Sequence, residues 1–341
     1  MDIKKNSNNK SPFVSVIVAG RNEEHNIGRC INSLSKLTYP AGLMEIILVN
    51  DNSTDKTFDI MTELTKDIKT FKVINSRKSN AGNLKAKANA IDTAIEHCKG
   101  DIIISTDADC EVPPDWVGET VRYYKDKTGM VCGFTKIKSV NTLFDKMQNL
   151  DWMYLLTLAS SSSGLKMILS CLGNNLSFSK EAYEKVGGYK SISFSVTEDL
   201  ALMRNINSRS GLEVLYPVDK GCLVETLPCK DLSELFSQKR RWFRGGTGIN
   251  FLGYIVGFEL YILSIMLVSG LLFLNYKIYL CLILIKIISE IMLLSFTLKK
   301  LDLLTLLKYY PLFILYFAFY GLILPWSFLF SRKIRWKGKE Y

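Results

Sequence analysis

Two carboxylates separated by one residue follow a short apolar run near the first third of the chain. Residues 101–105 (Asp-Ile-Ile-Ile-Ser) form the run, and Asp107 and Asp109 come shortly after it. In extended backbone, residues i and i+2 point to the same side, so both carboxylates can face one cation. Hard divalent ions such as Mg²⁺ or Mn²⁺ prefer oxygen ligands and are often shared with substrate phosphates. Asp107 and Asp109 are therefore candidate metal ligands, although an Asp-x-Asp tripeptide alone is more often a plain loop.

A second polar stretch follows another apolar run. Residues 50–57 (Asn-Asp-Asn-Ser-Thr-Asp-Lys-Thr) come directly after the run 45–49. Ser53, Thr54 or Asp55 can cap a following helix. That role is compatible with ligand binding, because a carboxylate here can accept hydrogen bonds from a nucleobase or a ribose.

Lysines form a third candidate group. Lys85 and Lys87 lie where a glycine-containing segment leads into a predicted helix. Taken alone they form a solvated helix face, whereas beside a metal site a lysine can contact a diphosphate. Few residues are available for other kinds of catalytic or metal site. The chain has two histidines, His25 and His97, and its eight cysteines form no Cys-x-x-Cys pair. We therefore expect buried thiols in a reducing compartment and, if a metal is bound, carboxylate ligands.

These polar stretches need a scaffold, and the apolar periodicity predicts one. The predicted strands are 13–19, 45–49, 71–74 and 101–105, and the predicted helices are 23–37, 54–68 and 86–98. Strands alternating with helices predict an α/β fold with a mostly parallel sheet covered on both faces. In such sheets ligands bind beyond the carboxyl ends of the strands. Residues 21–23, 50–55 and 107–109 all fall at those ends.

The C-terminal quarter is too apolar for an ordinary soluble enzyme. Residues 251–330 carry eight charged side chains, and the apolar stretches 251–274, 277–298 and 303–330 each exceed the ~20 residues that cross a bilayer. We expect two or three spans. Three spans would place the basic tail on the side of the membrane opposite the catalytic domain, against the positive-inside tendency. Because of Pro311 and Pro325, the last segment is alternatively re-entrant.

Two segments have the charge or polarity expected of chain that lies at a membrane surface. Residues 331–341 hold five basic and one acidic side chain, and 144–170 is apolar but interrupted at 160–164. We predict that the tail faces anionic lipid, rather than nucleic acid, and that 144–170 forms helices against the sheet or the membrane surface. The expected organisation is a polar arm (1–12), a catalytic domain (13–245), transmembrane helices (251–330) and a basic tail (331–341). From the apolar stretches we expect a multi-pass protein of the cell (inner) membrane. Because the arm has no signal-peptide core, we expect the catalytic domain to be cytosolic.

Taken in order, motifs across 13–245 resemble the inverting, nucleotide-sugar-dependent glycosyltransferases of family 2, which have the GT-A fold. The matching segments are 14–24 (VSVIVAGRNEE), 49–57 (VNDNSTDKT), 87–92 (KANAID), 105–116 (STDADCEVPPDW), 173–175 (GNN), 197–199 (TED) and 238–242 (QKRRW). Each segment alone is weak evidence, but their shared order is strong. Two positions depart from the family pattern: Asn50 replaces an Asp, and Asp92 replaces an Asn.

The resemblance implies a nucleotide-sugar site. Glu23 and Asp51 would hold the uridine, with Asn22 beside them, and Lys87 would lie near the diphosphate. Asp107 would contribute to the same site.

The resemblance also implies the catalytic groups. Asp107 and Asp109 would place Mg²⁺ or Mn²⁺ on the diphosphate, with Asp109 the more direct ligand. Asp199 would remove the proton of the acceptor hydroxyl, with Glu198 as the alternative base. The pair Glu198-Asp199 is otherwise a helix start capped by Thr197.

On the acceptor side, the resemblance places Asn174 and Asn175. Gln238, Arg241 and Trp242 would belong to the nucleotide-sugar site, where Arg241 and Trp242 would close over the diphosphate and acceptor. Arg241 and Trp242 also suit an interfacial pair before a membrane span.

The expected function is transfer of a sugar from a nucleotide sugar, a UDP-sugar by this pattern, to a membrane lipid or lipid-linked acceptor. A processive polysaccharide synthase is the main alternative, because the Gln-x-x-Arg-Trp motif occurs in both kinds of enzyme. A nucleotidyl- or phosphotransferase and a catalytically silent membrane scaffold are further alternatives.

Overall fold

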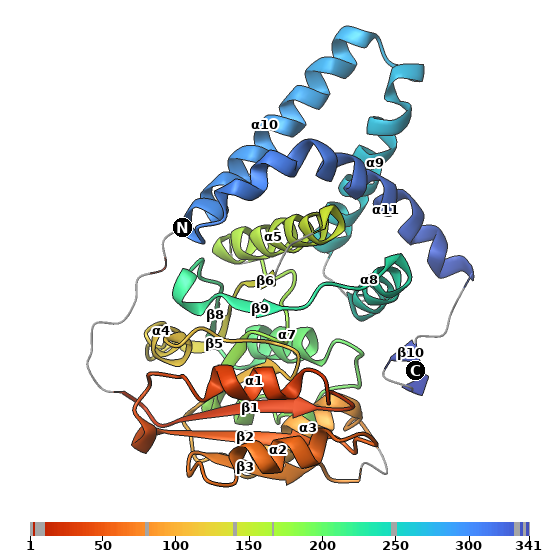
Figure 1. Ribbon diagram of the computed structural model, residues 1–341. Helices are drawn as coiled ribbons and strands as arrows, with labels where there is room; N and C mark the ends of the chain where they lie inside the picture. The colour runs from red at the N-terminus through yellow and green to blue at the C-terminus, as the bar shows by residue number, and fades with distance from the viewer. Residues whose placement is uncertain are drawn as a thin grey trace. The chain divides into compact units, whose positions relative to one another are not determined.

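The computed structural model describes residues 3, 11–78, 82–138, 142–165, 167–246, 251–330, 335–336 and 339–340. Most of the predicted arm, and of the predicted basic tail apart from the short strands β10 (Arg335–Trp336) and β11 (Lys339–Glu340), lies outside these residues. The chain divides into two compact units, Met1–Lys136 with Ala159–Leu227 and Ile137–Leu158 with Pro228–Tyr341. Figure 1 labels their elements.

The first unit is built on a seven-stranded sheet of order β3-β2-β1-β4-β7-β5-β8. Its strands are β1 (Val14–Gly20), β2 (Met44–Asn50), β3 (Phe71–Asn75), β4 (Ile102–Asp107), β5 (Thr128–Cys132), β7 (Leu176–Ser179) and β8 (Glu213–Leu215). β1 to β4 run parallel, and β7 is antiparallel to both of its neighbours, β4 and β5. A two-stranded sheet pairs β6 (Thr135–Ile137) with β9 (Val224–Thr226). The predicted mostly parallel α/β sheet is confirmed.

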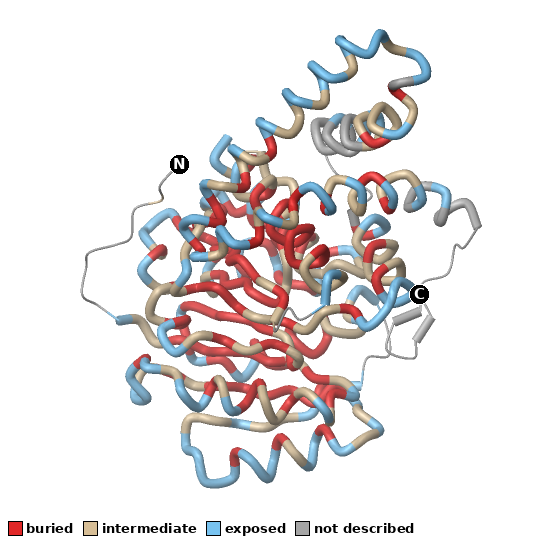
Figure 2. The backbone as a smooth tube through the Cα atoms, turned by 45° about the horizontal axis from the view of Figure 1, so that its top comes forward, coloured by how far each residue is buried: buried red, intermediate tan, exposed pale blue. Residues whose placement is uncertain are grey.

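The central strands are apolar on both faces because helices cover both. Val14, Val16 and Val18 of β1 point into a core that they share with apolar residues of α1 (Ile27–Leu34), α2 (Thr57–Thr65) and α4 (Trp116–Val121). The alternate residue Ile17 is equally buried, and α3 (Ala86–Ile95) packs against β1 and β2. Figure 2 shows these strands as a continuous buried layer, whereas the helices show buried and exposed sides. Because helices cover both faces, these strands need no polar face.

The remaining helices of the first unit are short. They are α6 (Lys180–Lys185), α7 (Glu198–Arg209) and three 3₁₀ turns, η1 (Ala41–Leu43), η2 (Tyr189–Ser191) and η3 (Lys220–Cys222). The three predicted helices are present but shorter than predicted: α1 and α2 begin later, α3 begins at residue 86 as predicted, and all three end earlier. The segment before α1 turns instead, with Asn22 in a left-handed conformation (φ 53°) and the Glu23 N–H donating to the Thr57 hydroxyl.

Helix α5 (Leu143–Gly164) corrects one expectation. The serines at 160–163 do not interrupt it. Their hydroxyls donate to carbonyl oxygens instead: Ser160 to Tyr216 (2.7 Å) and Ser163 to Val214 (3.3 Å). The last turn of the helix therefore lies against β8, and the serine side chains satisfy backbone groups there.

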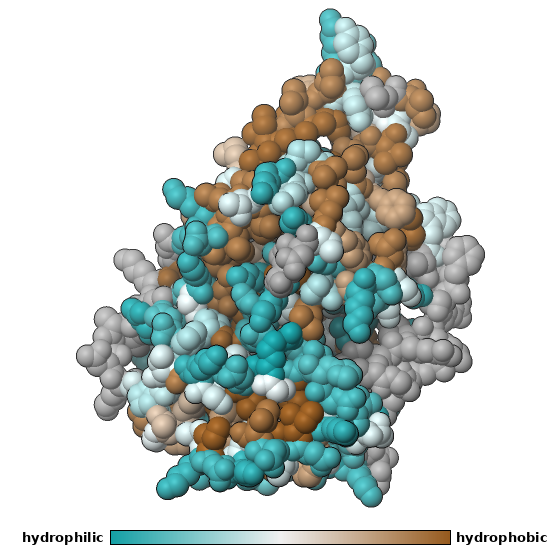
Figure 3. Space-filling model, viewed as in Figure 1, coloured by the Kyte–Doolittle hydropathy of each residue, from teal (hydrophilic) through white to brown (hydrophobic). Residues whose placement is uncertain are grey.

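The second unit contains most of α5 together with α8 (Leu232–Gly246), α9 (Phe251–Phe273), α10 (Tyr276–Lys300), the 3₁₀ turn η4 (Leu304–Tyr309) and α11 (Tyr310–Phe330). Among the described residues, two segments are long and apolar enough to cross a membrane, Tyr276–Lys300 and Leu304–Ile323. Only 11% of the most apolar window of the first is buried, and Figure 3 shows apolar side chains gathered on these helices. Pro311 is the second residue of α11, where a missing N–H costs little.

Candidate active site

The register of the sheet brings the predicted polar stretches together. Gly20 at the end of β1 pairs with Asn50 at the end of β2, and Ala19 pairs with Asp107 at the end of β4. Three chain segments far apart in sequence therefore leave the sheet side by side. This is the edge at which open α/β sheets bind ligands.

The loops after β1 and β2 are joined by hydrogen bonds. The N–H of Asn22 donates to Ser53 Oγ (3.1 Å), and its Oδ1 accepts from the Thr54 N–H (2.8 Å). Asn tolerates the left-handed conformation of this position better than most residues. Glu23 is buried, and its Oε2 accepts from the Asn26 amide (2.8 Å). Asn22 therefore shapes the predicted nucleotide site, while Glu23 supplies a carboxylate.

Asp51 lies at the same edge with two fixed contacts. Ser76 Oγ donates to its Oδ1 (2.9 Å), and Arg21 Nη1 lies 3.9 Å from its Oδ2. Neighbouring Asn50 has a structural role, since its amide donates to Asn75 Oδ1 (2.8 Å) and its Oδ1 accepts from the Ser53 N–H (3.2 Å). A carboxylate at position 50 has no hydrogen to donate to Asn75.

Lys87 lies among the carboxylates of the predicted site. Its Nζ is 2.5 Å from Oδ1 of Asp107 and 3.5 Å from Oε1 of Glu198. Burial alone lowers the pKa of Lys87, but the charges of Asp107, Glu198 and Asp199 outweigh burial and raise the pKa above its usual value. The lysine is therefore a permanent cation between Asp107 and Glu198.

Glu198 and Asp199 begin α7 and face this cation. Burial raises the pKa of both carboxyl groups, and the charge of Lys87 partly lowers each again. The backbone N–H groups of Leu200 and Gly173 also stabilise the charged form of Asp199. A carboxylate with a raised pKa is a stronger base than an exposed one, so either residue suits proton abstraction.

Gly173 lies against Asp199, the predicted base. A Cβ atom there would be 3.0 Å from both Cβ and Oδ2 of Asp199 and 3.2 Å from Nζ of Lys87. Because real Cβ contacts are seldom so short, only glycine fits without displacing the two side chains. The glycine of the Gly-x-Asn segment is therefore a shape requirement of the site.

Asp107 and Asp109 offer oxygen donors for a divalent cation. Burial, and then the charges of Asp109 and Asp107, raise the pKa of both Cys30 and Cys110, so the charges of both carboxylates act on the same two thiols. Among the described residues there is no cluster of three or more acidic, His or Cys side chains arranged to hold a metal. Two carboxylates fit an ion that takes its remaining ligands from a diphosphate and water.

The two predicted acceptor-side asparagines are buried and hydrogen-bonded. Asn174 Oδ1 accepts from the Thr135 hydroxyl (3.0 Å). Asn175 Oδ1 accepts from the Trp116 indole (3.1 Å), and its amide donates to the carbonyls of Phe134 and Cys222 (both 2.7 Å). These contacts support a positioning contribution for Asn175, because its polar atoms already have partners.

Gln238, Arg241 and Trp242 lie on α8, which belongs to the second unit. The ring of Trp242 packs edge-to-face on Trp152 of α5, with centroids 5.5 Å apart. Their part in catalysis stays a prediction.

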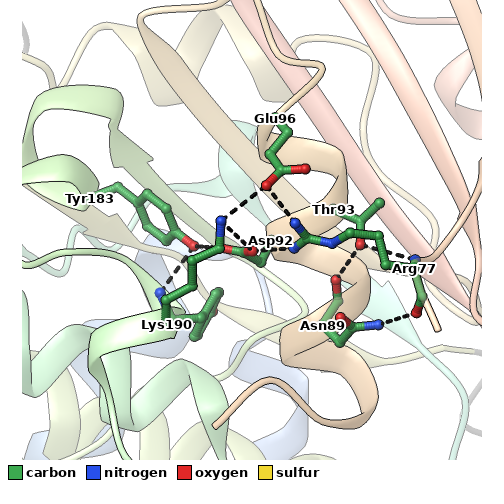
Figure 4. A network of polar contacts seen from close by, with 8 residues as sticks. Arg77, Asn89, Asp92, Thr93, Glu96, Tyr183 and Lys190 are labelled. Carbon is green, nitrogen blue, oxygen red and sulfur yellow. Dashed lines mark hydrogen bonds and ion pairs between the residues drawn. The ribbon is translucent and has the colours of Figure 1, made fainter. Parts of the chain in front are cut away.

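Several residues of the site carry no sequence signal that we recognised. Arg21 and Ser76 contact Asp51, and a network around Asp92 holds α3, the helix that carries Lys87 (Figure 4). The pKa of buried Tyr189 is raised by burial and then by the charge of Glu198. Arginines, serines and tyrosines are common in loops, so only spatial neighbours distinguish these.

Comparison with known proteins agrees with this geometry. The family model described as "Glycosyl transferase family 2" matches residues 15–198. A beta-monoglucosyldiacylglycerol synthase of Nostoc sp. is 29% identical over 239 residues, which are 69% of this chain and 49% of that protein. A poly-beta-1,6-N-acetyl-D-glucosamine synthase of Staphylococcus epidermidis is 25% identical over 235 residues, 68% of this chain and 54% of that protein. The chain spans about half the length of these curated relatives.

A solved structure shares the fold. A mannosyltransferase of Pyrobaculum calidifontis, in complex with GDP-Man and Mn²⁺, superposes with a TM-score of 0.61 at 16% identity, covering 94% of this chain and 90% of that one. The sheet, the order of the motifs and the family match agree: the chain belongs to glycosyl transferase family 2, and its first unit is a glycosyltransferase domain of GT-A fold.

Proposed function

We propose that this protein transfers one sugar, with inversion, from a nucleotide sugar to a membrane lipid. The observation that carries the proposal is the cluster of Lys87, Asp107, Glu198 and Asp199 at the carboxyl edge of the sheet. In this proposal Lys87 supplies the cation, Asp107 a metal-binding carboxylate and Asp199 the base. A displacement at the anomeric carbon needs those groups on opposite faces of the sugar.

The donor is a nucleotide sugar, and by the family pattern a UDP-sugar. Glu23 and Asp51 would accept hydrogen bonds from the nucleoside, and Lys87 would balance charge near the diphosphate. Asp107 and Asp109 would hold Mg²⁺ or Mn²⁺, which when bound neutralises charge on the departing diphosphate. A Mn²⁺ ion in the similar mannosyltransferase structure is consistent with this choice.

Asp199 is the proposed general base. Its carboxylate takes the proton of the acceptor hydroxyl while that oxygen bonds to the anomeric carbon and the bond to the diphosphate breaks. Inversion needs one base and no enzyme nucleophile. Glu198 is the alternative, and its contact with Lys87 favours an electrostatic contribution instead.

A lipid acceptor at the cytosolic face of the cell membrane is the proposed partner. Supporting observations are the two apolar helices of the second unit and the relative named as a glucosyldiacylglycerol synthase. Arg240 and Arg244 of α8 precede these helices, and basic residues favour the cytosolic side of a multi-pass protein. The basic segment 331–341 would add attraction to anionic lipid. A polysaccharide synthase is the second candidate, favoured by the Staphylococcus epidermidis relative.

A donor screen on membrane-embedded protein tests the proposal. Several nucleotide sugars, each labelled in the sugar, are incubated with Mg²⁺ or Mn²⁺ and a total lipid extract, and both diphosphate release and labelled lipid are measured. The Asp199→Asn variant should lose about 10²- to 10⁴-fold in rate. The exposed variant Glu63→Gln on α2 is the matched control. Label in polymer would move the assignment to polysaccharide synthesis, pyrophosphate release would indicate nucleotidyl transfer, and no release with any donor would contradict enzymatic function.

A further inference from the structure

A buried carboxylate on α3 has no direct contact with the proposed catalytic groups. Asp92 accepts a hydrogen bond from the Tyr183 hydroxyl (2.6 Å) on one oxygen and forms an ion pair with the Arg77 guanidinium on the other. Lys190 Nζ lies 3.8 Å away. One turn later, Glu96 pairs with the same two cations, Arg77 at 2.5 Å and Lys190 at 3.0 Å. Figure 4 shows the resulting network.

The network joins α3 to both sides of the active site. Arg77 directly follows Ser76, the hydrogen-bond partner of Asp51 on the nucleotide side. The Tyr183 hydroxyl oxygen accepts from the backbone N–H of Tyr189, which lies in η2 in the segment that leads to α7. Helix α3 is thus held between the segment after β3 and the segment that leads to α7.

The first turn of α3 needs such an anchor. Ala86 has a positive φ of 50°, which is strained for a residue with a Cβ, and no side-chain hydrogen bond caps the helix start. Lys87 follows immediately and enters the carboxylate cluster. The strain persists only if surrounding structure holds it, and Asn89, whose amide donates to the Arg77 carbonyl (2.7 Å), belongs to the same network.

The residue type at position 92 fits this role. The family pattern has Asn there, whereas this chain has Asp. An amide carries no charge, so it cannot form ion pairs with the half-buried Arg77 and the exposed Lys190 as the buried carboxylate does. The presence of Arg77 and Lys190 around position 92 therefore goes with the Asp.

We propose that Asp92 is a positioning residue that keeps Lys87 between Asp107 and Glu198. It acts through α3 and the strained turn at Ala86, without touching substrate. The inference deepens the proposed function, on which it rests only for its activity readout.

The first test measures Lys87 itself. Folded protein is treated briefly with an amine-acylating reagent, and labelling of each lysine is read by mass spectrometry in wild type, Asp92→Asn and the milder Tyr183→Phe. We expect labelling of Lys87 to rise about tenfold in Asp92→Asn, as local opening becomes easier, and less in Tyr183→Phe. Exposed Lys85 is the internal reference, and Glu63→Gln is the control variant. Unchanged labelling of Lys87, or an equal rise at every lysine of the first unit, would overturn the proposal.

The second test is a double-mutant cycle on turnover. If Asp92 acts through Lys87, Asp92→Asn lowers turnover in the wild type but has little further effect in a Lys87→Met background. Equal effects in both backgrounds would show a general structural role and refute the proposal. Failure of the proposed function is separable, because it leaves no turnover with any donor while the labelling result stands.

Discussion

Lys87 and Asp107 form an ion pair of 2.5 Å between the first turn of α3 and the end of β4. The same ammonium lies 3.5 Å from Glu198 at the start of α7. One cation on α3 therefore contacts acidic groups from two other elements, β4 and α7, and the charge of a third carboxylate, Asp199, also acts on it. This contact affects the pH dependence of turnover, the space available beside Gly173 and the backbone strain at the start of α3.

Turnover should depend on the ionisation of Asp199. Burial raises the pKa of Asp199 above 3.8, and the charge of Lys87 lowers it again in part. The acid limb of the kcat/KM profile should therefore lie at a higher pH than the pKa of an ordinary Asp. Turnover rises with pH because the base must lose its proton. Lys87→Met removes the lowering charge and should shift the limb to higher pH. A pH–rate profile measures this, and a shift to lower pH would contradict the proposed electrostatics.

The free energy of unfolding should change with pH in the opposite direction to turnover, falling as the pH rises. Burial raises the pKa of Glu198 above 4.5, so the folded state favours the protonated form. The stability this contributes is complete below the unfolded-state pKa and is lost as pH rises through the folded-state pKa. Glu198→Gln should therefore raise Tm at neutral pH and leave Tm almost unchanged at acidic pH. A lower Tm at neutral pH would show that the Lys87 contact outweighs burial.

Gly173→Ala should impair catalysis more than folding. The added Cβ would lie 3.0 Å from Asp199 and 3.2 Å from Lys87. Since displacing catalytic groups by about 1 Å can cost ~10²-fold, we expect kcat to fall at least ~10-fold. Gly42→Ala is the matched control, because a Cβ at Gly42 meets nothing within 4 Å. Equal activities of the two variants would contradict the assigned geometry.

The left-handed turn at Ala86 predicts the effect of two substitutions. Ala86→Gly removes a strain of about 1–2 kcal/mol, and some of the gain is lost to the greater entropy of the unfolded chain. We expect unchanged or slightly higher stability. Ala86→Val should lower stability, because β-branched residues fit φ 50° worse still. Thermal unfolding of both variants checks this, and equal Tm values would argue against a positive φ.

A buried ion pair in the second unit should be sensitive to single changes. Asp151 of α5 pairs with Lys239 of α8 and accepts from the Tyr320 hydroxyl of α11 (2.7 Å). Asp151→Ala leaves Lys239 buried without its counter-charge and should cost about 3–5 kcal/mol. The double variant Asp151→Leu/Lys239→Met should cost much less. Thermal unfolding in detergent compares them, and equal losses would show that charge pairing is unimportant here.

Much of the first unit was predictable from local pattern. The runs before 20, 50 and 107 are buried strands because they are β-branched and short, and their polar endings share one sheet edge because parallel strands end together. The motif order predicted the family, which the family model confirmed. The prediction that the serines at 160–163 interrupt the apolar segment was wrong. Two of their side chains donate to backbone carbonyls at β8, a contact that no local sequence pattern reports.

The fold class, the strand ends and the available carboxylates follow from periodicity and residue type, so they were predictable before folding is considered. The contacts that each polar group makes depend instead on the folded chain. Lys87 and Asp107 are 20 residues apart in sequence, and Lys87 and Glu198 are 111 apart, yet one ammonium meets both. Side-chain contacts of this kind depend on how helices cross the sheet, so the central position of Lys87 and the role of Asp92 emerge only from the folded chain.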